Sequence, residues 1–269
     1  MSEITEKCKD FTPKDQFIAY IDILGYEMHM KKHGAGELAQ ALDKIIMGVA
    51  SFPAFPTIDS KSRSKFKVFS DNILICSETN WYEVLLHVQY IQQYLLAAGI
   101  FSRGCMLYGE LYFDDNFVCG QGIIDAHRLE SEVAIFPRII VDESFIVKME
   151  PSIPDFYETA LQAESSRQRM DFSQVKLKDN WVEIFELFKK DFDGMFFFNY
   201  MVLLEATDST SQEEKESIFA ERLIHHRNII KQNLINNVNN KRILQKYQWC
   251  QNHHNEFCRQ HGYHNLTIE

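Results

Sequence analysis

Three features that often place a chain in a broad class are missing here: paired cysteine motifs, long hydrophobic runs and an excess of basic residues. The six cysteines include no Cys-x-x-Cys pair, and Cys76, Cys105 and Cys119 lie in apolar contexts typical of free core thiols. No apolar run approaches the roughly 20 residues of a membrane-spanning helix, and the polar, charged N-terminus is unlike a signal peptide. We therefore expect a cytoplasmic protein with reduced cysteines and no membrane partner.

The charge balance is acidic, with 38 Asp and Glu residues against 28 Lys and Arg residues and a net charge of −10. A protein whose main partner is a nucleic-acid backbone needs a basic face, so we expect no nucleic-acid partner. A nucleotide substrate is still compatible with this charge, because a bound divalent metal can invert the local field.

The composition is that of an ordinary globular protein, with 45% hydrophobic and 25% charged residues in 269. This length suits one large domain, or one domain with an integral extension. The chain becomes polar and irregular after residue 150, but no Pro/Gly/Ser-rich linker marks the change. We expect a main domain over residues 1–150 and a mainly helical extension over 151–269 that packs on it.

The hydrophobic pattern predicts alternating strands and helices in the first 150 residues. Apolar runs of strand length and 3.6-residue periodicity indicate the order β-α-β-β-α-β, followed by a further strand, helix and strand. The first six elements are those of a ferredoxin-like α/β sandwich, an α+β fold with a sheet buried under helices. The expected strands cover 17–26, 65–69, 72–77, 100–109, 110–113 and 138–141, and the expected helices cover 34–52, 81–98 and 120–130.

The last third is predicted to be mainly helical. Amphipathic patterns indicate helices at 180–190, 210–236 and 241–261, while 195–204 is compatible with either helix or strand. A zinc site in the final helix is possible, but the spacing of its candidate ligands fits no standard structural finger: Cys250, His253, His254 and Cys258. Four histidines here are more typical of solvated or packing positions on helix surfaces than of ligands: His225, His226, His253 and His254.

Two aspartates stand at the ends of apolar strands, where a metal could bind. Asp22 lies inside the run 17–26, and Asp71 lies at the tight connection of the predicted hairpin. Either could be an ordinary turn or capping residue. If the first strand and the hairpin lie side by side, both carboxylates project toward one spot and can hold a pair of divalent cations.

The residues that follow Asp22 would complete such a site. The backbone carbonyl of Ile23 is a natural third oxygen ligand for the metal. The amides of Leu24, Gly25 and Tyr26 would face phosphate oxygens, because successive amides at a turn form an anion-binding concavity.

Four segments, taken in order, resemble the class III nucleotidyl cyclases. They correspond to the first metal-binding strand, the second metal-aspartate hairpin, an Arg-Gly strand and the dimer-arm helix of that class. The closer similarity is to the bacterial pyrimidine cyclases of anti-phage signalling, the Pycsar family, because of 137–141 (PRIIV) and the late segment 247–255 (YQWCQNHHN). The four segments are 17–26 (FIAYIDILGY), 67–71 (KVFSD), 101–109 (FSRGCMLYG) and 120–130 (GQGIIDAHRLE).

The resemblance implies a homodimeric enzyme with two Mn²⁺ or Mg²⁺ ions per active site, held by Asp22, Ile23 and Asp71. Residues 1–150 would be its catalytic domain. Arg128 would neutralise charge on the α-phosphate, entering the site from the partner chain together with Lys67. Without the resemblance, Arg128 could equally be a helix-surface arginine in an ion pair with a nearby glutamate.

Two positions depart from the purine cyclases. An asparagine is expected four residues before Arg128 and a polar base-reading residue eleven before it, but Ile124 and Phe117 stand there. An apolar Phe fills space and favours a smaller, pyrimidine base. Lys67 matches the purine-reading lysine, and Arg103 could form a structural ion pair or contact base or phosphate.

The expected reaction converts UTP to 3′,5′-cyclic UMP and pyrophosphate. The resemblance further implies an anti-phage second messenger that activates a separate effector protein. The choice of UTP over CTP has little support in the sequence. The other open alternatives are a purine cyclase, another palm-type nucleotidyl transferase, and an inactive module that binds a nucleotide or a protein partner.

Overall fold

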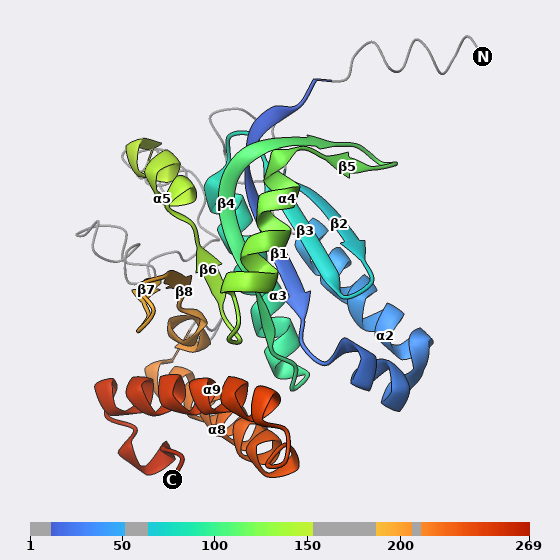
Figure 1. The fold of residues 1–269 in the computed structure, drawn as a ribbon. Coiled ribbons are helices and arrows are strands. Elements are labelled where there is room, and N and C mark those ends of the chain that lie inside the picture. Colours follow the sequence, from blue (N-terminus) through green and yellow to red (C-terminus); the bar gives the residue numbers. More distant parts are fainter. Residues whose placement is uncertain (1–11, 52–63, 153–186, 206–210) are drawn as a thin grey trace.

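A computed structural model describes residues 12–51, 64–152, 187–205 and 211–269 of the chain. These residues form an α+β fold around one eight-stranded mixed sheet with the order β2-β3-β1-β4-β6-β8-β7, in which β5 pairs with β4 (Figure 1). The first strands are β1 (Lys14–Ile23), β2 (Lys65–Phe69), β3 (Asn72–Ser77) and β4 (Ser102–Phe113). With α2 (Tyr26–Ser51) and α3 (Trp81–Ala97), they follow the predicted β-α-β-β-α-β order of a ferredoxin-like sandwich.

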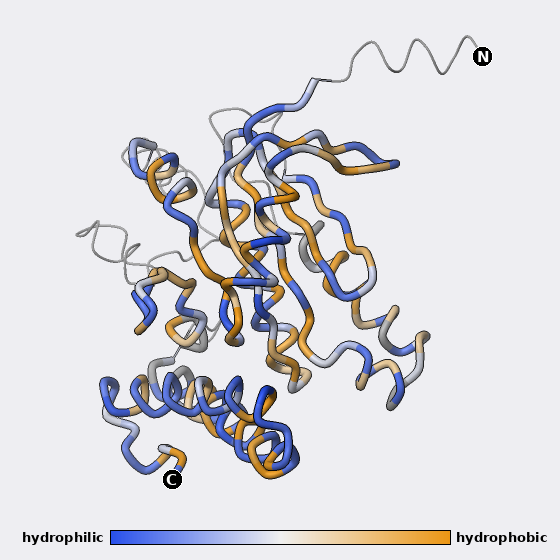
Figure 2. The backbone as a smooth tube through the Cα atoms, in the orientation of Figure 1, coloured by the Kyte–Doolittle hydropathy of each residue, from blue (hydrophilic) through white to orange (hydrophobic). Residues whose placement is uncertain are grey.

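The sheet is buried on both faces. Along β1, Ala19 and Ile21 join the core cluster under α3, whereas Ile18 and Tyr20 join the cluster that contains Ala126 of α4 (Gln121–Arg128). Side chains alternate between the faces of a strand, so a continuous apolar run indicates a strand covered on both sides. Figure 2 shows this hydrophobic colouring along the central strands.

The beginning of the chain departs from prediction at two boundaries. β1 ends at Ile23, and Gly25 adopts a positive φ of 74°, which turns the chain directly into α2. The helix therefore begins eight residues before the predicted start at residue 34 and is kinked at Gly34 (φ 80°). Its buried stripe is also narrower than expected: Ile45 is buried, but Ile46 is exposed.

β4 is one continuous strand of 12 residues, so the predicted division into 100–109 and 110–113 is wrong. After residue 113 the chain turns and enters the short strand β5 (Val118–Cys119). The helix after it ends in a π-helical turn, η2 (Leu129–Val133). Gly122 lets this helix approach the sheet, because a Cβ there would lie 2.8 Å from the Glu110 carbonyl oxygen.

The C-terminal extension completes the sheet as well as covering it. β6 (Ile139–Val141) pairs with β8 (Phe196–Phe198), which pairs with β7 (Phe188–Lys190). Phe188–Lys190 was predicted to end a helix over 180–190; the start of that segment lies outside the described residues. Between 195 and 204, a strand is followed by the 3₁₀ helix η5 (Tyr200–Glu205). The remaining elements are α5 (Glu143–Met149), η3 (Glu150–Ser152), α8 (Gln212–Asn236), α9 (Lys241–Gln260) and η6 (His264–Leu266).

A buried arginine fastens the extension to the sheet. Arg138, fully buried before β6, forms ion pairs with Asp191 and Asp193 in the turn between β7 and β8. Trp249 of α9 donates its Nε1–H to Asp191 at 2.8 Å and stacks on Phe136, with 6.2 Å between ring centroids. An unpaired buried guanidinium is costly, so these contacts hold β6, β8 and α9 together. α8 and α9 then lie across the ends of the strands (Figure 1).

Candidate functional site

The two predicted metal aspartates come from adjacent strand ends. Asp22 pairs with Asn72 at the start of β3, and the Ile23 amide donates to the Asp71 carbonyl at 2.8 Å. Asp71 follows Ser70, whose positive φ of 57° makes the β2–β3 hairpin tight. The backbones that carry both carboxylates are therefore neighbours, as the strand-and-hairpin pattern predicted.

A chain of charges runs from Asp22 into the α4 layer. Arg103, opposite Asp22 on β4, donates from Nε to Asp22 Oδ2 at 2.8 Å and forms a second ion pair with Glu130. The Asp22 and Arg103 side chains are only 13% and 17% exposed, so water screens this contact weakly. Glu130 is buried in η2. We call Asp22, Asp71, Arg103 and Glu130 the strand-end cluster.

Three carboxylates act on the phenol of Tyr20, which lies beside this cluster. Burial, together with the negative charges of Glu130, Asp22 and Asp71, raises the pKa of Tyr20 to about 12. Burial also raises the pKa of Glu130, while Arg103 opposes that shift. All three carboxylates thus act on one phenol, which indicates that their side chains gather on the α4 side of the sheet.

The available oxygen ligands are more typical of a magnesium site, which has few protein ligands, than of a metal site enclosed by protein side chains. Among the described residues, no group of three or more His, Cys, Asp or Glu side chains could hold a metal ion. Mg²⁺ usually keeps several waters and binds one or two carboxylates together with substrate phosphates. Asp22 and Asp71 each use one carboxylate oxygen for a hydrogen bond, to Arg103 and Asn72 respectively. Their other oxygens accept no hydrogen bond from the described residues.

The backbone after Asp22 is less available than expected. The Leu24 amide already donates to the Phe101 carbonyl at 3.0 Å. The Leu24 amide therefore already has a hydrogen-bond partner, which would have to be given up if this amide bound phosphate. The phosphate role expected of Gly25 and Tyr26 stays a prediction. These two residues form the turn into the N-terminus of α2, where amides favour anions.

Arg128 and Lys67 are not part of the strand-end cluster within one chain. Arg128 is 62% exposed, and its ion pair is with Asp125 at 3.3 Å, rather than with the glutamates after it. Lys67 Nζ donates to the Asp114 carbonyl at 2.8 Å and lies 5.1 Å from the Phe113 ring centroid. Both side chains could meet the cluster only through a second chain or a rearrangement.

Exposed apolar side chains accompany Arg128. Ile124, one turn earlier on α4, is 61% exposed, and Phe117 in the preceding turn is 50% exposed. Phe117 packs near the Tyr112 ring, with 5.4 Å between ring centroids. The predicted role of Phe117 as a filler of the base pocket is thus not seen within one chain.

Sequence reasoning missed Glu130 and Lys246. Glu130 lies two residues after Arg128, and its ion pair with Arg103 joins two segments that no pattern in the sequence connects. Lys246, on α9, is half-buried, and its charge acts on Asp22 and Glu130. No pattern in the sequence links that helix to the first strand, because their proximity depends on packing across the extension.

A second polar cluster lies wholly within the extension and consists of Tyr200, His226, His253 and His254. We call it the histidine cluster. Tyr200 Oη lies 3.1 Å from His226 Nε2, the Nδ1 atoms of His226 and His254 are 2.9 Å apart, and His254 Nε2 lies 3.0 Å from the Leu266 carbonyl. His226 and His254 are fully buried and His253 nearly so, so the expectation of helix-surface positions is wrong for them.

These distances define one arrangement of protons in the chain of contacts. A carbonyl only accepts, so His254 Nε2–H donates to Leu266 and leaves His254 Nδ1 as an acceptor. His226 Nδ1–H then donates to His254, and the Tyr200 hydroxyl donates to His226 Nε2. Both imidazoles are neutral in this arrangement, and burial lowers the pKa of each.

The zinc alternative for this region gains no support. Cys258 Sγ lies 3.5 Å from His254 Nε2, the nitrogen that faces the Leu266 carbonyl. Burial raises the pKa of the Cys250 thiol well above its usual value, which disfavours the thiolate that zinc requires. The five cysteines in the described part of the chain are free.

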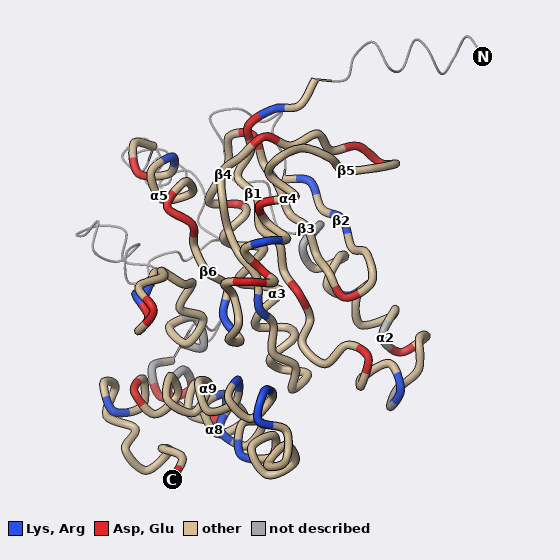
Figure 3. Tube along the Cα trace, viewed as in Figure 1, with Lys and Arg blue, Asp and Glu red and all other residues tan. Residues whose placement is uncertain are grey.

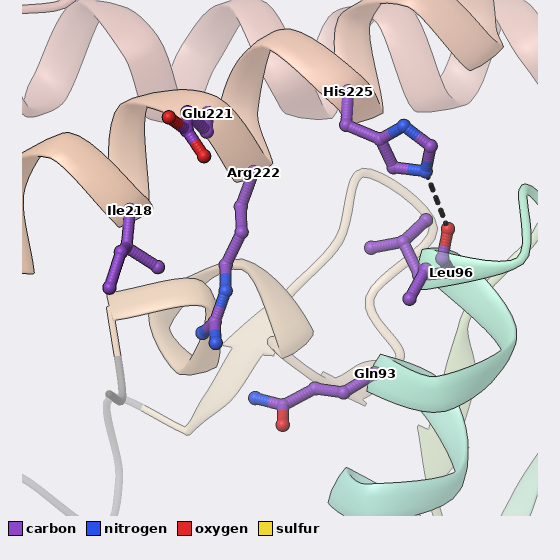
Figure 4. Close-up of a pocket in the computed structure, with 7 residues that line it drawn as sticks. Gln93, Leu96, Ile218, Glu221, Arg222 and His225 are labelled. Carbon is purple, nitrogen blue, oxygen red and sulfur yellow. Dashed lines mark hydrogen bonds between the residues drawn. The ribbon is translucent and has the colours of Figure 1, made fainter. Parts of the chain in front are cut away.

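A cavity of about 450 Å³ opens between α3 and α8, away from the strand-end cluster (Figure 4). Gln93 and Leu96 line it from α3, and Ile218, Glu221 and Arg222 line it from α8. His225 closes one side by contacting the Leu96 carbonyl at 3.2 Å. Neither predicted metal aspartate reaches this cavity.

Comparison with known proteins identifies no relative: no family model matches the chain, and no curated protein matches it. In the described part of the chain, every helix is too short or too polar to cross a membrane. The resemblance to the class III cyclases therefore depends on the four segments and on the strand-end geometry.

Proposed function

We propose that the chain is a nucleotidyl cyclase that converts a pyrimidine nucleoside triphosphate, UTP, to its 3′,5′-cyclic monophosphate and pyrophosphate. The observation that carries this proposal is the meeting of Asp22 and Asp71 at neighbouring strand ends, joined by the 2.8 Å hydrogen bond from Ile23 to Asp71. Phosphoryl transfer needs charge neutralisation and positioning more than covalent chemistry from the protein. Paired carboxylates at neighbouring strand ends would hold the divalent ions that supply the first of these needs.

The protein's own residues would divide the work. Asp22, Asp71 and the Ile23 carbonyl would hold Mn²⁺ or Mg²⁺, two ions per site, which supply charge neutralisation at the phosphates and acidify the 3′-hydroxyl. Gly25 and Tyr26 would orient phosphate oxygens at the start of α2. Arg103 would be positioned by Glu130 and released from Asp22 when the substrate arrives, leaving its guanidinium free to contact phosphate.

A homodimer would supply the remaining groups. Arg128 is largely exposed on α4, as is Ile124 on the same helix, and this exposure supports a contact with a second chain. A two-fold axis would give two sites, each with Arg128 and Lys67 from the partner chain. We further propose that the enzyme works in the cytoplasm and that its product is an anti-phage signal for a separate effector.

One observation favours a second candidate, a nucleotide-binding module without turnover. Asp22 is already neutralised by Arg103, and a permanent ion pair there would keep a metal away. The same ion pair is compatible with an enzyme if substrate phosphates draw Arg103 off the carboxylate. Product formation distinguishes the two.

The test is incubation of the protein with UTP, CTP, ATP and GTP in separate reactions with Mn²⁺, followed by chromatography of the products. We expect cyclic UMP and pyrophosphate from UTP. Cyclic CMP would assign the alternative pyrimidine, and a cyclic purine nucleotide would assign a purine cyclase. Absence of every cyclic product, with retained nucleotide binding, would establish the binding module.

A further inference from the structure

The C-terminal helix α9, which belongs to the extension, packs beside the candidate site. Tyr247 of α9 packs against Phe101, with 5.8 Å between ring centroids. Phe101 precedes β4 and accepts a hydrogen bond from the Leu24 amide, two residues after Asp22. Leu24 and Tyr247 both pack on the same C-terminal core. These contacts hold the middle of α9 against the strand ends that carry Asp22 and Arg103.

Lys246, adjacent to Tyr247, is the cation that this packing brings to the site. It is half-buried, and the carboxylates of Asp22 and Glu130 and the guanidinium groups of Arg103 and Arg242 all act on its charge. Burial and the two arginines lower its pKa, and the two carboxylates oppose that shift. Figure 3 shows basic segments of α9 below the acidic and basic segments at the ends of β1 and β4.

The charge arrangement leaves room for an anion. Asp22 and Glu130 already share Arg103, and within the described residues no ion pair or hydrogen bond joins Lys246 to a carboxylate. Lys246 and Arg242 are one helical turn apart on the same face of α9. Two cations on one face of this helix suit a polyphosphate, which can contact both while a metal neutralises its other oxygens.

We propose that Lys246 binds the triphosphate tail of the substrate, so that α9 is part of the active site. The proposal rests on the proposed function and adds a substrate-binding residue to the same site. The C-terminal extension would then take part directly in substrate binding, through the ammonium group of Lys246. The contact would contribute mainly to phosphate binding, because a lysine ammonium binds phosphate as a point charge.

The test uses Lys246→Gln, with Lys246→Arg as the charge-conserving variant and Lys241→Gln as the control. Lys241 is exposed at the start of the same helix. Titration calorimetry with Mn²⁺ present would measure binding of UTP, UMP and inorganic tripolyphosphate. We expect Lys246→Gln to weaken UTP and tripolyphosphate by roughly 10- to 100-fold, as for the loss of a charged hydrogen bond. UMP binding should change little, and Lys241→Gln should match the wild type.

Three outcomes separate the proposals. Unchanged UTP binding in Lys246→Gln, or equal weakening of UTP and UMP, would overturn the role of Lys246 and leave the cyclase proposal standing. If UTP binding depends on Lys246 but the wild-type protein makes no cyclic product, the contact between Lys246 and the triphosphate stands and the proposed cyclase activity is overturned. A wild type that binds neither UTP nor tripolyphosphate would overturn both. Thermal unfolding of each variant checks that it is folded.

Discussion

The strand-end cluster and the histidine cluster contain side chains that are equally suited to chemistry, but they differ in how completely their polar atoms are used. In the histidine cluster, Tyr200, His226 and His254 form a closed series of hydrogen bonds that ends on the Leu266 carbonyl. In the strand-end cluster, Asp22 and Asp71 each keep a carboxylate oxygen that accepts no hydrogen bond from the described residues. The histidine cluster's series of three side chains is complete without a ligand, although the buried Nε2 of His253 in the same cluster has no hydrogen-bond partner among the described residues. The strand-end cluster is not complete in this sense.

The difference shows why residue type alone does not identify a site. A buried polar network that is fully satisfied stabilises one packing and rejects added charge. A partly exposed group of carboxylates with excess negative charge attracts cations instead. Substitutions in the two clusters should therefore affect different properties, activity in one and stability in the other.

The largest effect should come from Asp71→Asn in the strand-end cluster. Even groups that only support a metal ligand usually cost 10- to 100-fold when lost, so we expect at least about a 100-fold decrease in cyclic nucleotide formation. The free energy of unfolding should change little, because Asp71 is only partly buried. Asp15→Asn, at the exposed opposite end of β1, is the matched control for product yield. Equal activity in both variants would contradict the assignment.

The reverse pattern is expected for His226→Leu. It leaves the Tyr200 hydroxyl donor and the His254 Nδ1 acceptor without partners in the core, and unsatisfied buried groups cost about 1–3 kcal/mol each. We expect the free energy of unfolding to fall by about 2–4 kcal/mol in urea denaturation. Turnover per folded molecule should persist at low temperature. Adding Tyr200→Phe should recover part of the loss, and no recovery would argue against the hydrogen-bonded series.

Acid should destabilise the histidine cluster. Burial lowers the pKa of His253 to about 3, and it also lowers those of His226 and His254. Unfolded histidine titrates near about 6.5, so below that pH the unfolded chain binds more protons than the folded one. This stability is complete above about pH 6.5 and is lost as the pH falls toward about 3. At about pH 5, His253 alone should cost about 2 kcal/mol.

Urea denaturation at about pH 7.5 and about pH 5 measures this difference. The His253→Gln variant should lose about 2 kcal/mol less than the wild type over the same interval, since its side chain does not titrate. An identical pH dependence in both proteins would show that His253 does not remain neutral on folding.

The smallest effect is expected for Lys14→Ala, which lies in neither cluster. Lys14 pairs with Glu78 at 2.7 Å, but the two side chains are 57% and 35% exposed. Surface ion pairs of this kind contribute about 0–1 kcal/mol at most, and less in salt. Both unfolding and turnover should stay close to wild type. A change of several kcal/mol would mean that exposure is a poor guide to which charges matter in this protein.

Local patterns predicted the parts of the fold that depend on neighbouring residues. The hairpin that carries Asp71 and the buried strand that carries Asp22 follow from apolar runs and tight-turn residues. The continuous β4 was missed because the sequence offers no sign that Gly109 is accommodated within a strand rather than at a turn. Phe188–Lys190 forms a strand because it pairs with β8, which in turn pairs with β6. This pairing is a tertiary effect that local sequence does not encode.

The candidate site was predictable only in part for the same reason. Asp22 and Asp71 are marked by their positions at a strand end and a hairpin turn, but the ion pair of Asp22 with Arg103 depends on the register of β4 against β1. Lys246 was invisible because α9 reaches the strand ends through side-chain packing of Tyr247 and Trp249. The histidines of the histidine cluster were predicted to lie on helix surfaces because the helix sequences are polar. The sequence does not show that one face of each helix is buried by packing.

Manganese binding in the presence of UTP tests the central claim most directly, because the free Mn²⁺ signal in electron paramagnetic resonance reports bound ions without requiring turnover. The account predicts that wild-type protein depletes this signal, that Asp22→Asn and Asp71→Asn each abolish most of the depletion, and that Asp15→Asn behaves as wild type. Equal manganese binding by the wild type and both strand-end variants would contradict the account.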